Sequence, residues 1–253
     1  MGTHEIFRLA SHLKPKIVHY ISTLSVFPME DELPLLPIEE SDQLDFDKLL
    51  ITGYAQSKWV SEKMALLARS RGLCVNIYRL GRITGHSQTG AWNTEDLVCR
   101  MIKGCIQLGM APMIATKIDL TPVDYTCDAL INISMQKEGL GKTYHLIHPN
   151  PISFNKLIDY LNFCGYPIEQ VSYAKWSKAL LVTAQKGTAN ALHPLLDLFS
   201  PSNEKNITEN HSPLFLAENT EKMLSGSKIH CATAEELLPV YINYLKKIGY
   251  LPN

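Results

Sequence analysis

Apolar residues along this chain follow two alternating patterns, one with the period of a helix and one typical of buried strands. The first thirteen residues carry a helical pattern, and the run at 16–21 (KIVHYI) is rich in β-branched residues, which favours a strand covered on both faces. Residues 54–71 carry the strongest helical pattern, ended by Gly72, and a second apolar run at 74–79 predicts another strand. This order of elements predicts parallel strands in an α/β fold.

The pattern changes character near residue 150. A third strand is predicted at 143–148, and helical patterns predominate after it. A polar segment with many breakers at 200–213 predicts a mobile loop. Further helices are predicted at 92–109, 125–135, 154–163, 173–189, 193–199 and 235–248. We therefore expect an α/β region up to residue 150 and a smaller, mainly helical region from 151 to 253.

Composition and charge exclude several classes of protein. The chain is 45% hydrophobic and 19% charged with a net charge of −1. This composition has neither the excess of basic residues typical of nucleic-acid binding nor the polarity typical of disorder. Its six cysteines are scattered, which favours reduced thiols in a cytoplasmic protein. No apolar run reaches the roughly 18 residues of a membrane span. The acidic loop at 28–52 favours a solvated segment, with steering of a cationic partner as the alternative.

The most informative chemistry lies in Tyr54-x-x-x-Lys58 and in Ser22-Thr23, which follow the predicted strand at 16–21. A tyrosine and a lysine four residues apart share one side of a helix. Alone, this spacing is weak, because a salt-bridging lysine beside a half-buried tyrosine is common. Its position between a strand that ends in Ser-Thr and a strand that ends in a Gly-rich turn strengthens it, since ligands of open α/β sheets bind at the carboxyl ends of strands.

These three functional groups suit the reduction of a carbonyl. A phenol can donate a proton to the carbonyl oxygen, and an ammonium one turn away stabilises a phenolate. The Thr23 hydroxyl can stabilise the developing alkoxide. The hydride would come from a nicotinamide cofactor, whose ribose hydroxyls lie within reach of Lys58.

Four motifs of the chain belong together: Ser22-Thr23, Tyr54-x-x-x-Lys58, Tyr78-Arg-Leu-Gly-Arg-Ile-Thr-Gly85 and Pro122-Val-Asp124. With the more specific sequences at 21–26, 79–90 and 144–153, they resemble the extended short-chain dehydrogenase/reductase superfamily. Within it, the chain is most similar to the thioester reductase domains of non-ribosomal peptide and polyketide synthases, with carboxylic acid reductases, male-sterility-type fatty acyl reductases and aminoadipate reductase as relatives.

The resemblance implies a function and a set of site residues. Such domains use NADPH to reduce an acyl or peptidyl thioester, held on the phosphopantetheine of a carrier protein, to an aldehyde or an alcohol. It implies Thr23, Tyr54 and Lys58 as the catalytic residues, with the turn Gly81–Ile83 beside the nicotinamide. The full set implied for cofactor binding is Ser22, Tyr54, Lys58, Gly81, Arg82 and Ile83.

The chain departs from the family pattern at its start. The family's opening T-G-x-x-G-x-x-G turn, which binds the cofactor pyrophosphate, is absent, and Gly81-x-x-x-Gly85 has the wrong spacing. We therefore expect the C-terminal half of a Rossmann-like parallel sheet (1–150) plus a helical substrate-binding subdomain (151–253). Loss of the first half would leave the strand at 17–21 as an exposed edge.

A missing N-terminal half has consequences for activity. We expect residues 1–253 alone to bind NADPH weakly or not at all, and binding at low-micromolar concentration in calorimetry would contradict this. The chain would then be a fragment, a truncated reading frame or one half of a split enzyme. Two other functions stay open: a catalytically inactive remnant that docks a carrier protein, and a nucleotide-sugar epimerase or dehydratase.

Other candidate residues carry less chemistry. His145 and His148 are three positions apart on a predicted strand and so point to opposite faces, and we expect no metal site. The three tryptophans favour packing, although Trp176 lining an acyl tunnel is an alternative.

Overall fold

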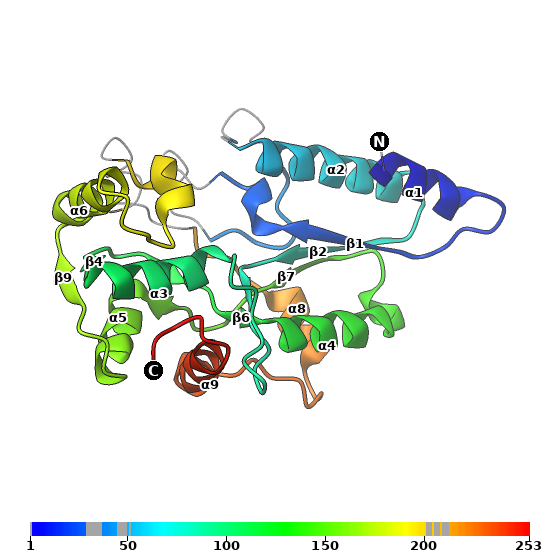
Figure 1. The fold of residues 1–253 in the computed structure, drawn as a ribbon. Helices are drawn as coiled ribbons and strands as arrows, with labels where there is room; N and C mark the ends of the chain where they lie inside the picture. Colours follow the sequence, from blue (N-terminus) through cyan, green and yellow to red (C-terminus); the bar gives the residue numbers. More distant parts are fainter. Residues whose placement is uncertain are drawn as a thin grey trace. The chain divides into compact units, whose positions relative to one another are not determined.

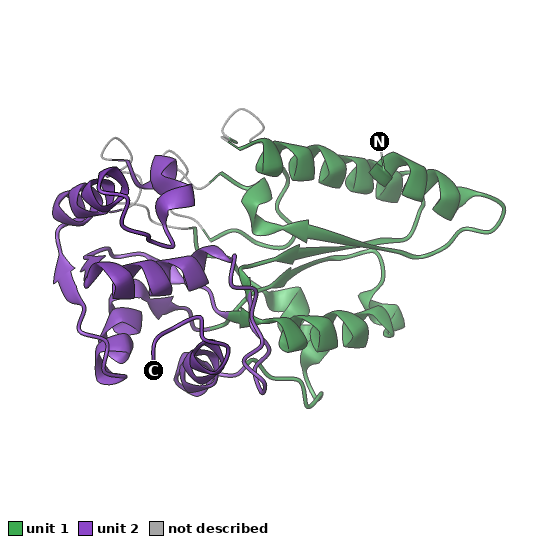
Figure 2. Cartoon of the chain, in the orientation of Figure 1, with its two compact units in different colours: residues 1–83, 121–149, 213–231 green, residues 84–120, 150–212, 232–253 purple. Residues whose placement is uncertain are grey.

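The computed structural model describes residues 2–28, 37–44, 50, 52–200, 204, 208 and 213–253 (Figure 1). Much of the predicted loop at 28–52 and most of the predicted mobile loop at 200–213 lie outside the described residues. The chain divides into two compact units (Figure 2). Both take segments from either side of residue 150, and the predicted split into a cofactor region and a substrate region stays a prediction. Unit 1 comprises residues 1–83, 121–149 and 213–231, and unit 2 comprises residues 84–120, 150–212 and 232–253.

Unit 1 contains a three-stranded parallel sheet, as the sequence predicted. Its order is β1-β2-β7, with β1 at Val18–Thr23, β2 at Val75–Leu80 and β7 at Thr143–Leu146. The strand β1 therefore forms one edge of this sheet. Ile17 and Ile21 are 48% and 39% exposed there, which agrees with the predicted exposed edge.

Helices cover both faces of this sheet (Figure 1). Alternate residues of β2 explain why: Ile77 packs with Ala65 of α2 on one face, whereas Tyr78 packs with Ile133 and Met223 on the other. The first face carries α1 (Gly2–Ser11) and α2 (Gly53–Ser70), and the second carries α4 (Val123–Ser134) and α8 (Glu218–Leu224). Short 3₁₀ turns lie at η1 (Leu24–Val26) and η3 (Lys137–Gly139).

Local sequence explains the bounds of α2. The Thr52 hydroxyl accepts the backbone N–H of Ala55 at 3.1 Å, which caps the first turn. Gly72 follows the helix with a φ of 91°, a conformation that glycine adopts without strain. The helix thus begins one residue before the predicted Tyr54 and ends one residue before the predicted Arg71.

Unit 2 is mainly helical, with short strand pairs between its helices. The predicted helix at 92–109 begins only at Leu97, because the Asp96 carboxylate caps it by accepting the N–H of Val98 at 2.8 Å. Its helices are α3 (Leu97–Leu108), α5 (Phe154–Phe163), α6 (Tyr173–Gln185) and α9 (Ala234–Lys247), with a 3₁₀ segment η4 at His193–Phe199. Its strand pairs are β4 (Met110–Pro112) with β9 (Glu169–Val171), parallel, and β5 (Lys117–Ile118) with β8 (Ile152–Ser153), antiparallel.

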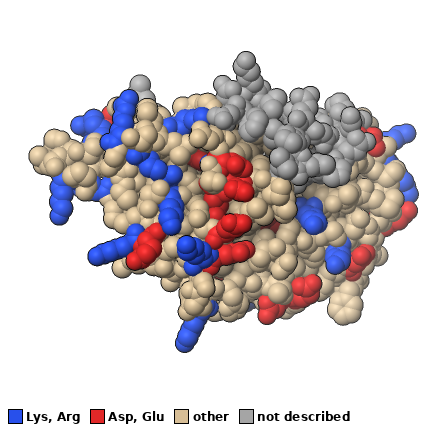
Figure 3. Space-filling model, turned by 180° about the vertical axis from the view of Figure 1, so that it is seen from behind, with Lys and Arg blue, Asp and Glu red and all other residues tan. Residues whose placement is uncertain are grey.

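Two further strands are very short: β3 at Ile83–Thr84 and β6 at Thr121–Pro122. On the face drawn in Figure 3, acidic and basic side chains both occur and neither sign covers the surface. Within the described ranges, no helix is long and apolar enough to span a membrane.

Candidate active site

The three candidate catalytic residues come from two neighbouring elements of unit 1. Thr23 ends β1, Tyr54 lies in the first turn of α2, and Lys58 lies one turn further on. The Lys58 ammonium donates a hydrogen bond to the Ile21 carbonyl oxygen at 3.0 Å, so α2 is fastened to β1 two residues before Thr23. Tyr54 is 57% exposed. An accessible phenol and an ammonium thus lie on the helix that packs on β1, the strand that ends at the threonine.

The Thr23 side chain is held by contacts with Ser25. Its hydroxyl oxygen accepts the N–H of Ser25 at 3.2 Å and so caps the 3₁₀ turn η1. It also approaches the Ser25 hydroxyl at 3.3 Å. The side chain is therefore held in place at the end of the strand.

The predicted cofactor turn lies at the same edge of the sheet. Thr23 and Leu80 are register partners, so Gly81 follows β2 where Thr23 ends β1. The Gly81 N–H donates to the Leu146 carbonyl at 2.9 Å, which ties this turn to the end of β7. Arg82 is exposed and Ile83 is half-buried. The carboxyl edge of the sheet thus brings together the segments on which the sequence placed catalysis and cofactor binding.

Ser22 has a different environment from its neighbours in the motif. Its side chain is buried, and its hydroxyl donates to the carboxylate of Glu62 on α2. The hydroxyl therefore already has an acceptor inside the protein. Its predicted contact with a cofactor stays a prediction.

A second phenol, Tyr20, lies close to the candidate residues. The Lys58 ammonium lies 5.8 Å from the centre of its ring. Burial is the main cause that raises the pKa of Tyr20, and the negative charge of Glu62 adds to it. Tyr20 therefore stays protonated at neutral pH, and Tyr54 is the more accessible phenol.

Sequence reasoning missed a buried ion pair beneath the site. The Glu62 carboxylate accepts a hydrogen bond from Arg79 Nε at 2.8 Å, and both side chains are almost completely inaccessible to solvent. The available signal was Arg79, a charged residue at the end of the predicted buried strand at 74–79, because a buried guanidinium requires a partner of opposite charge.

The pair continues into a polar row across the sheet. Arg79 Nη1 lies 3.3 Å from Nε2 of His145, its register partner on β7. His145 Nδ1 lies 2.7 Å from the Leu216 carbonyl oxygen, which can only accept a hydrogen bond, so Nδ1 carries the proton and Nε2 accepts from Arg79. Burial first, and then the charge of Arg79, lowers the pKa of His145 to about 3. This imidazole is neutral.

Glu40 joins the described loop at 37–44 to the same row. Its carboxylate accepts the His145 N–H at 2.8 Å and the Thr220 hydroxyl at 2.9 Å, and it also accepts the Asn219 N–H at 2.5 Å. Burial raises the pKa of Glu40 in spite of these hydrogen bonds. The loop, β7 and the start of α8 are thereby held together.

We expect His145 and Glu40 to make opposite contributions to the pH dependence of stability. His145 binds fewer protons in the folded state, so its contribution is complete above about pH 6.5 and is lost as the pH falls toward 3, at up to about 1.4 kcal/mol per pH unit. Glu40 binds its proton more tightly when folded, so its contribution decreases as the pH rises above 4.5. In urea unfolding measured from pH 4 to pH 7, we expect His145→Asn to flatten the rise of stability with pH and Glu40→Gln to steepen it. The same slope in all three proteins would contradict this assignment.

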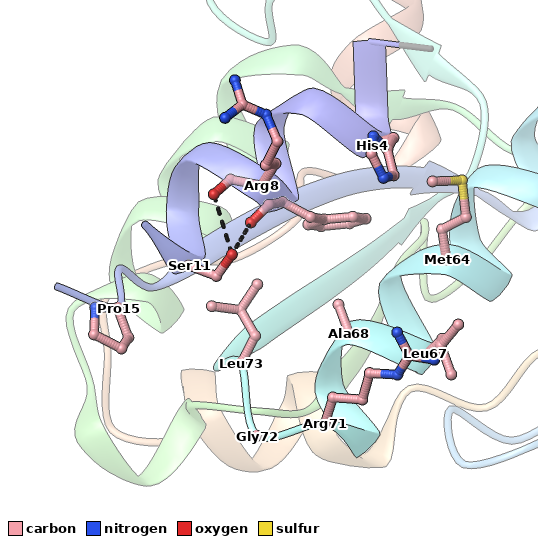
Figure 4. A pocket seen from close by; sticks show the side chains of 11 residues that line it. His4, Arg8, Ser11, Pro15, Met64, Leu67, Ala68, Arg71, Gly72 and Leu73 are labelled. Carbon is pink, nitrogen blue, oxygen red and sulfur yellow. Dashed lines mark hydrogen bonds between the residues drawn. The ribbon is translucent and has the colours of Figure 1, made fainter. Parts of the chain in front are cut away.

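A pocket of about 500 Å³ lies elsewhere in unit 1, between α1 and the second half of α2 (Figure 4). Its wall on α1 includes Ser11, whose hydroxyl donates to the Phe7 carbonyl oxygen at 2.9 Å. Its wall on α2 begins at Met64, ten positions after Tyr54. That separation is roughly 15 Å along a helix, so the pocket is not part of the candidate active site.

Comparison with known proteins supports this description of the fold. A model of the male sterility protein family matches residues 1–130. The chain is 35% identical over 254 residues to a linear gramicidin synthase of Brevibacillus parabrevis, covering 99% of this chain and 5% of that protein. It is 31% identical over 274 residues to the L-2-aminoadipate reductase large subunit of Penicillium chrysogenum, covering 100% of this chain and 19% of that protein.

Among solved structures, the terminal R domain from the myxalamid PKS-NRPS biosynthetic pathway superposes with a TM-score of 0.91 at 38% identity, over 99% of this chain and 63% of that one. The reductase domain of a non-ribosomal peptide synthetase from Mycobacterium tuberculosis shares the fold, with a TM-score of 0.72 at 22% identity over 99% of this chain and 65% of that one. The chain therefore spans less than two thirds of these domains.

The parallel sheet, with a threonine at the end of one strand and the tyrosine and lysine on the following helix, defines an extended short-chain dehydrogenase/reductase-type domain. Within that class, the chain belongs to the male sterility protein family.

Proposed function

We propose that this chain acts in the NADPH-dependent reductive release of an acyl or peptidyl thioester from a carrier protein, as an aldehyde or an alcohol. One observation carries the proposal: the Lys58 ammonium is fixed on the Ile21 carbonyl oxygen at 3.0 Å, beside the exposed Tyr54 and near the end of the strand that Thr23 closes. The 38% identity to the R domain of a PKS-NRPS pathway supports the same reaction.

The residues present fit the nicotinamide end of the cofactor. An exposed phenol and a lysine lie on α2, and the Gly81 turn follows the neighbouring strand at the carboxyl edge of the sheet, where ligands of such sheets bind. When bound, the nicotinamide would supply the hydride. In our proposal Lys58 binds the ribose hydroxyls, Thr23 orients the thioester carbonyl and Tyr54 donates the proton.

The remaining assignments are also proposals. We assign the phosphopantetheine to the substrate, as the arm that presents the thioester. The partner is an acyl or peptidyl carrier protein, and the reaction takes place in the cytoplasm. Neither metal nor nucleic acid enters the scheme.

The experiment uses the protein as its gene encodes it. It is mixed with carrier protein loaded with acyl-phosphopantetheine, and the loss of reduced nicotinamide is followed with NADPH and, in parallel, with NADH. We expect oxidation that requires the loaded carrier and is faster with NADPH, together with an aldehyde or alcohol product. Equal rates with unloaded carrier would contradict thioester reduction, and equal rates with NADH would contradict the cofactor preference.

A further inference from the structure

Tyr54, Lys58 and Glu62 stand at intervals of four along α2 and therefore line one side of the helix. Burial increases along this line: Tyr54 is 57% exposed, Lys58 is half-buried and Glu62 is completely buried. The two proposed catalytic groups and the buried carboxylate thus lie on one ridge of a single helix. Any contact that fixes Glu62 also fixes the rotation of that ridge about the helix axis.

The Glu62 carboxylate bridges the two strands beneath the helix. One oxygen accepts from Arg79 Nε on β2 at 2.8 Å, and the other accepts from the Ser22 hydroxyl on β1. Ser22 and Arg79 are register partners, and Thr23 follows Ser22 directly. Glu62 therefore fastens the catalytic helix one residue away from the candidate catalytic threonine.

Arg79 is a rigid partner for this carboxylate, because its other donors are also engaged. The centre of its guanidinium lies 4.7 Å from the centre of the Phe27 ring. Its further hydrogen bonds run to His145 Nε2 at 3.3 Å, to the Glu40 carbonyl at 3.4 Å and to the Asp42 carbonyl at 3.3 Å. The guanidinium is thus fixed by Phe27, His145 and the loop at 37–44 as well as by Glu62.

Burial of this ion pair is not an efficient way to stabilise a fold. Desolvation of a carboxylate and a guanidinium offsets most of their attraction, and apolar residues of similar volume often stabilise a protein equally well. What an apolar pair cannot supply is direction, since hydrogen bonds of defined length fix both the rotation and the axial position of a helix. The ion pair therefore fixes the orientation of this side of α2 more than it stabilises the fold.

We propose that Glu62 is a positioning residue for the reduction. Its bonds to Ser22 and Arg79 set the rotation of α2, so that Lys58 meets the Ile21 carbonyl and Tyr54 faces the reacting carbonyl beside Thr23. This inference rests on the proposed function, which assigns the catalytic roles on α2.

The first test replaces the pair by apolar residues in the full-length protein, as Glu62→Leu combined with Arg79→Met. We expect the urea midpoint to fall, because His145 Nε2 and the Glu40 and Asp42 carbonyls lose their donor. We expect kcat for thioester reduction to fall about 10- to 100-fold as well, because a small displacement of a catalytic group costs rate. KM should change by less than about threefold, since positioning affects the reaction step. A folded double variant with wild-type kcat would overturn the proposal.

Two conservative variants separate geometry from charge. Glu62→Gln keeps the length of the side chain and an oxygen for Arg79, so we expect kcat within about fivefold of wild type. Glu62→Asp keeps the charge but withdraws the carboxylate by one methylene, so we expect kcat to fall about tenfold or more. If the apolar double variant does not fold, these two decide: a wild-type kcat in Glu62→Asp overturns the proposal.

The same helix offers a matched control at its other end. Arg69 donates to the Val75 carbonyl at 3.0 Å, to the Lys142 carbonyl at 2.9 Å and to the Thr143 hydroxyl at 3.2 Å. It stands 15 positions after Tyr54, roughly 22 Å along the helix. We expect Arg69→Met to lower the urea midpoint but to leave kcat within about threefold of wild type. A loss of kcat equal to that of the apolar double variant would show that any anchor of α2 suffices, and so would overturn a specific role for Glu62.

A measurement without catalysis keeps this inference distinct from the proposed function. In hydrogen–deuterium exchange, we expect residues 53–61 to exchange faster in Glu62→Asp and in the apolar double variant, and residues 66–70 to exchange faster in Arg69→Met. If wild-type protein does not reduce thioesters, the proposed function fails while this comparison still tests the positioning. Unchanged exchange at 53–61 in both Glu62 variants overturns it.

Discussion

Tyr54→Phe is expected to lower the rate of thioester reduction by about 10²- to 10⁴-fold in the full-length protein, the range that a positioned general acid contributes. The substitution removes only the phenolic oxygen, and the ring at this position is 57% exposed, so the fold should be unaffected. Lys58 keeps its bond to the Ile21 carbonyl, and cofactor binding should therefore stay within about twofold of wild type. Single-turnover oxidation of NADPH measures the first quantity, and calorimetry measures the second.

Tyr20→Phe is the matched control for this prediction. Tyr20 also lies close to the Lys58 ammonium, but burial raises the pKa of its phenol. We expect this variant to keep the rate within about threefold of wild type. If Tyr20→Phe abolishes reduction and Tyr54→Phe does not, the proton donor is Tyr20.

Trp176→Ala is expected to destabilise the protein by about 3 to 5 kcal/mol, the usual cost of deleting a large buried aromatic side chain. Trp176 is completely buried in the core of unit 2. Its ring centre lies 5.6 Å from that of Tyr173 and 5.3 Å from that of Phe199, the latter in an edge-on contact. This environment favours packing over the alternative of a residue that lines an acyl tunnel. Urea unfolding followed by far-ultraviolet circular dichroism measures the loss.

Phe163→Ala is the control for the aromatic deletion in the same unit. Phe163 ends α5 and is 86% exposed, so we expect a change of less than about 0.5 kcal/mol. A loss as large as that of Trp176→Ala would show that the change in unfolding free energy does not depend on how deeply the deleted side chain is buried. A small loss of unfolding free energy for Trp176→Ala would instead indicate that neighbouring side chains move to fill the space.

The helix at 53–70 shows how far the periodicity of a sequence is reliable. Its bounds, and the placement of Tyr54 and Lys58 on consecutive turns, follow from local residues alone. Leu67 is an apolar residue of this helix, yet its side chain is 50% exposed and lines the pocket beside α1. Exposure depends on which element packs opposite, and local spacing does not contain that information.

Unit 2 shows a related limit at element boundaries. The apolar spacing after Trp92 favours a helix, but the structure begins α3 at Leu97. The helix begins there because the Asp96 carboxylate accepts a hydrogen bond from the N–H of Val98 and so caps the first turn. The catalytic roles assigned from the resemblance to Thr23, Tyr54 and Lys58 stay predictions that the experiments above test.

The sequence by itself determined the alternation of helices and parallel strands, the family resemblance, and the location of a phenol, an ammonium and a hydroxyl near one strand end. Only the tertiary structure decided what lies beneath them. Glu62 and Arg79 are 17 positions apart, and Glu40 and His145 are 105 apart, yet they meet in one buried row. Helical and strand periods are set by neighbours along the chain, whereas a buried charge is stabilised by whichever partner the packed elements bring to it.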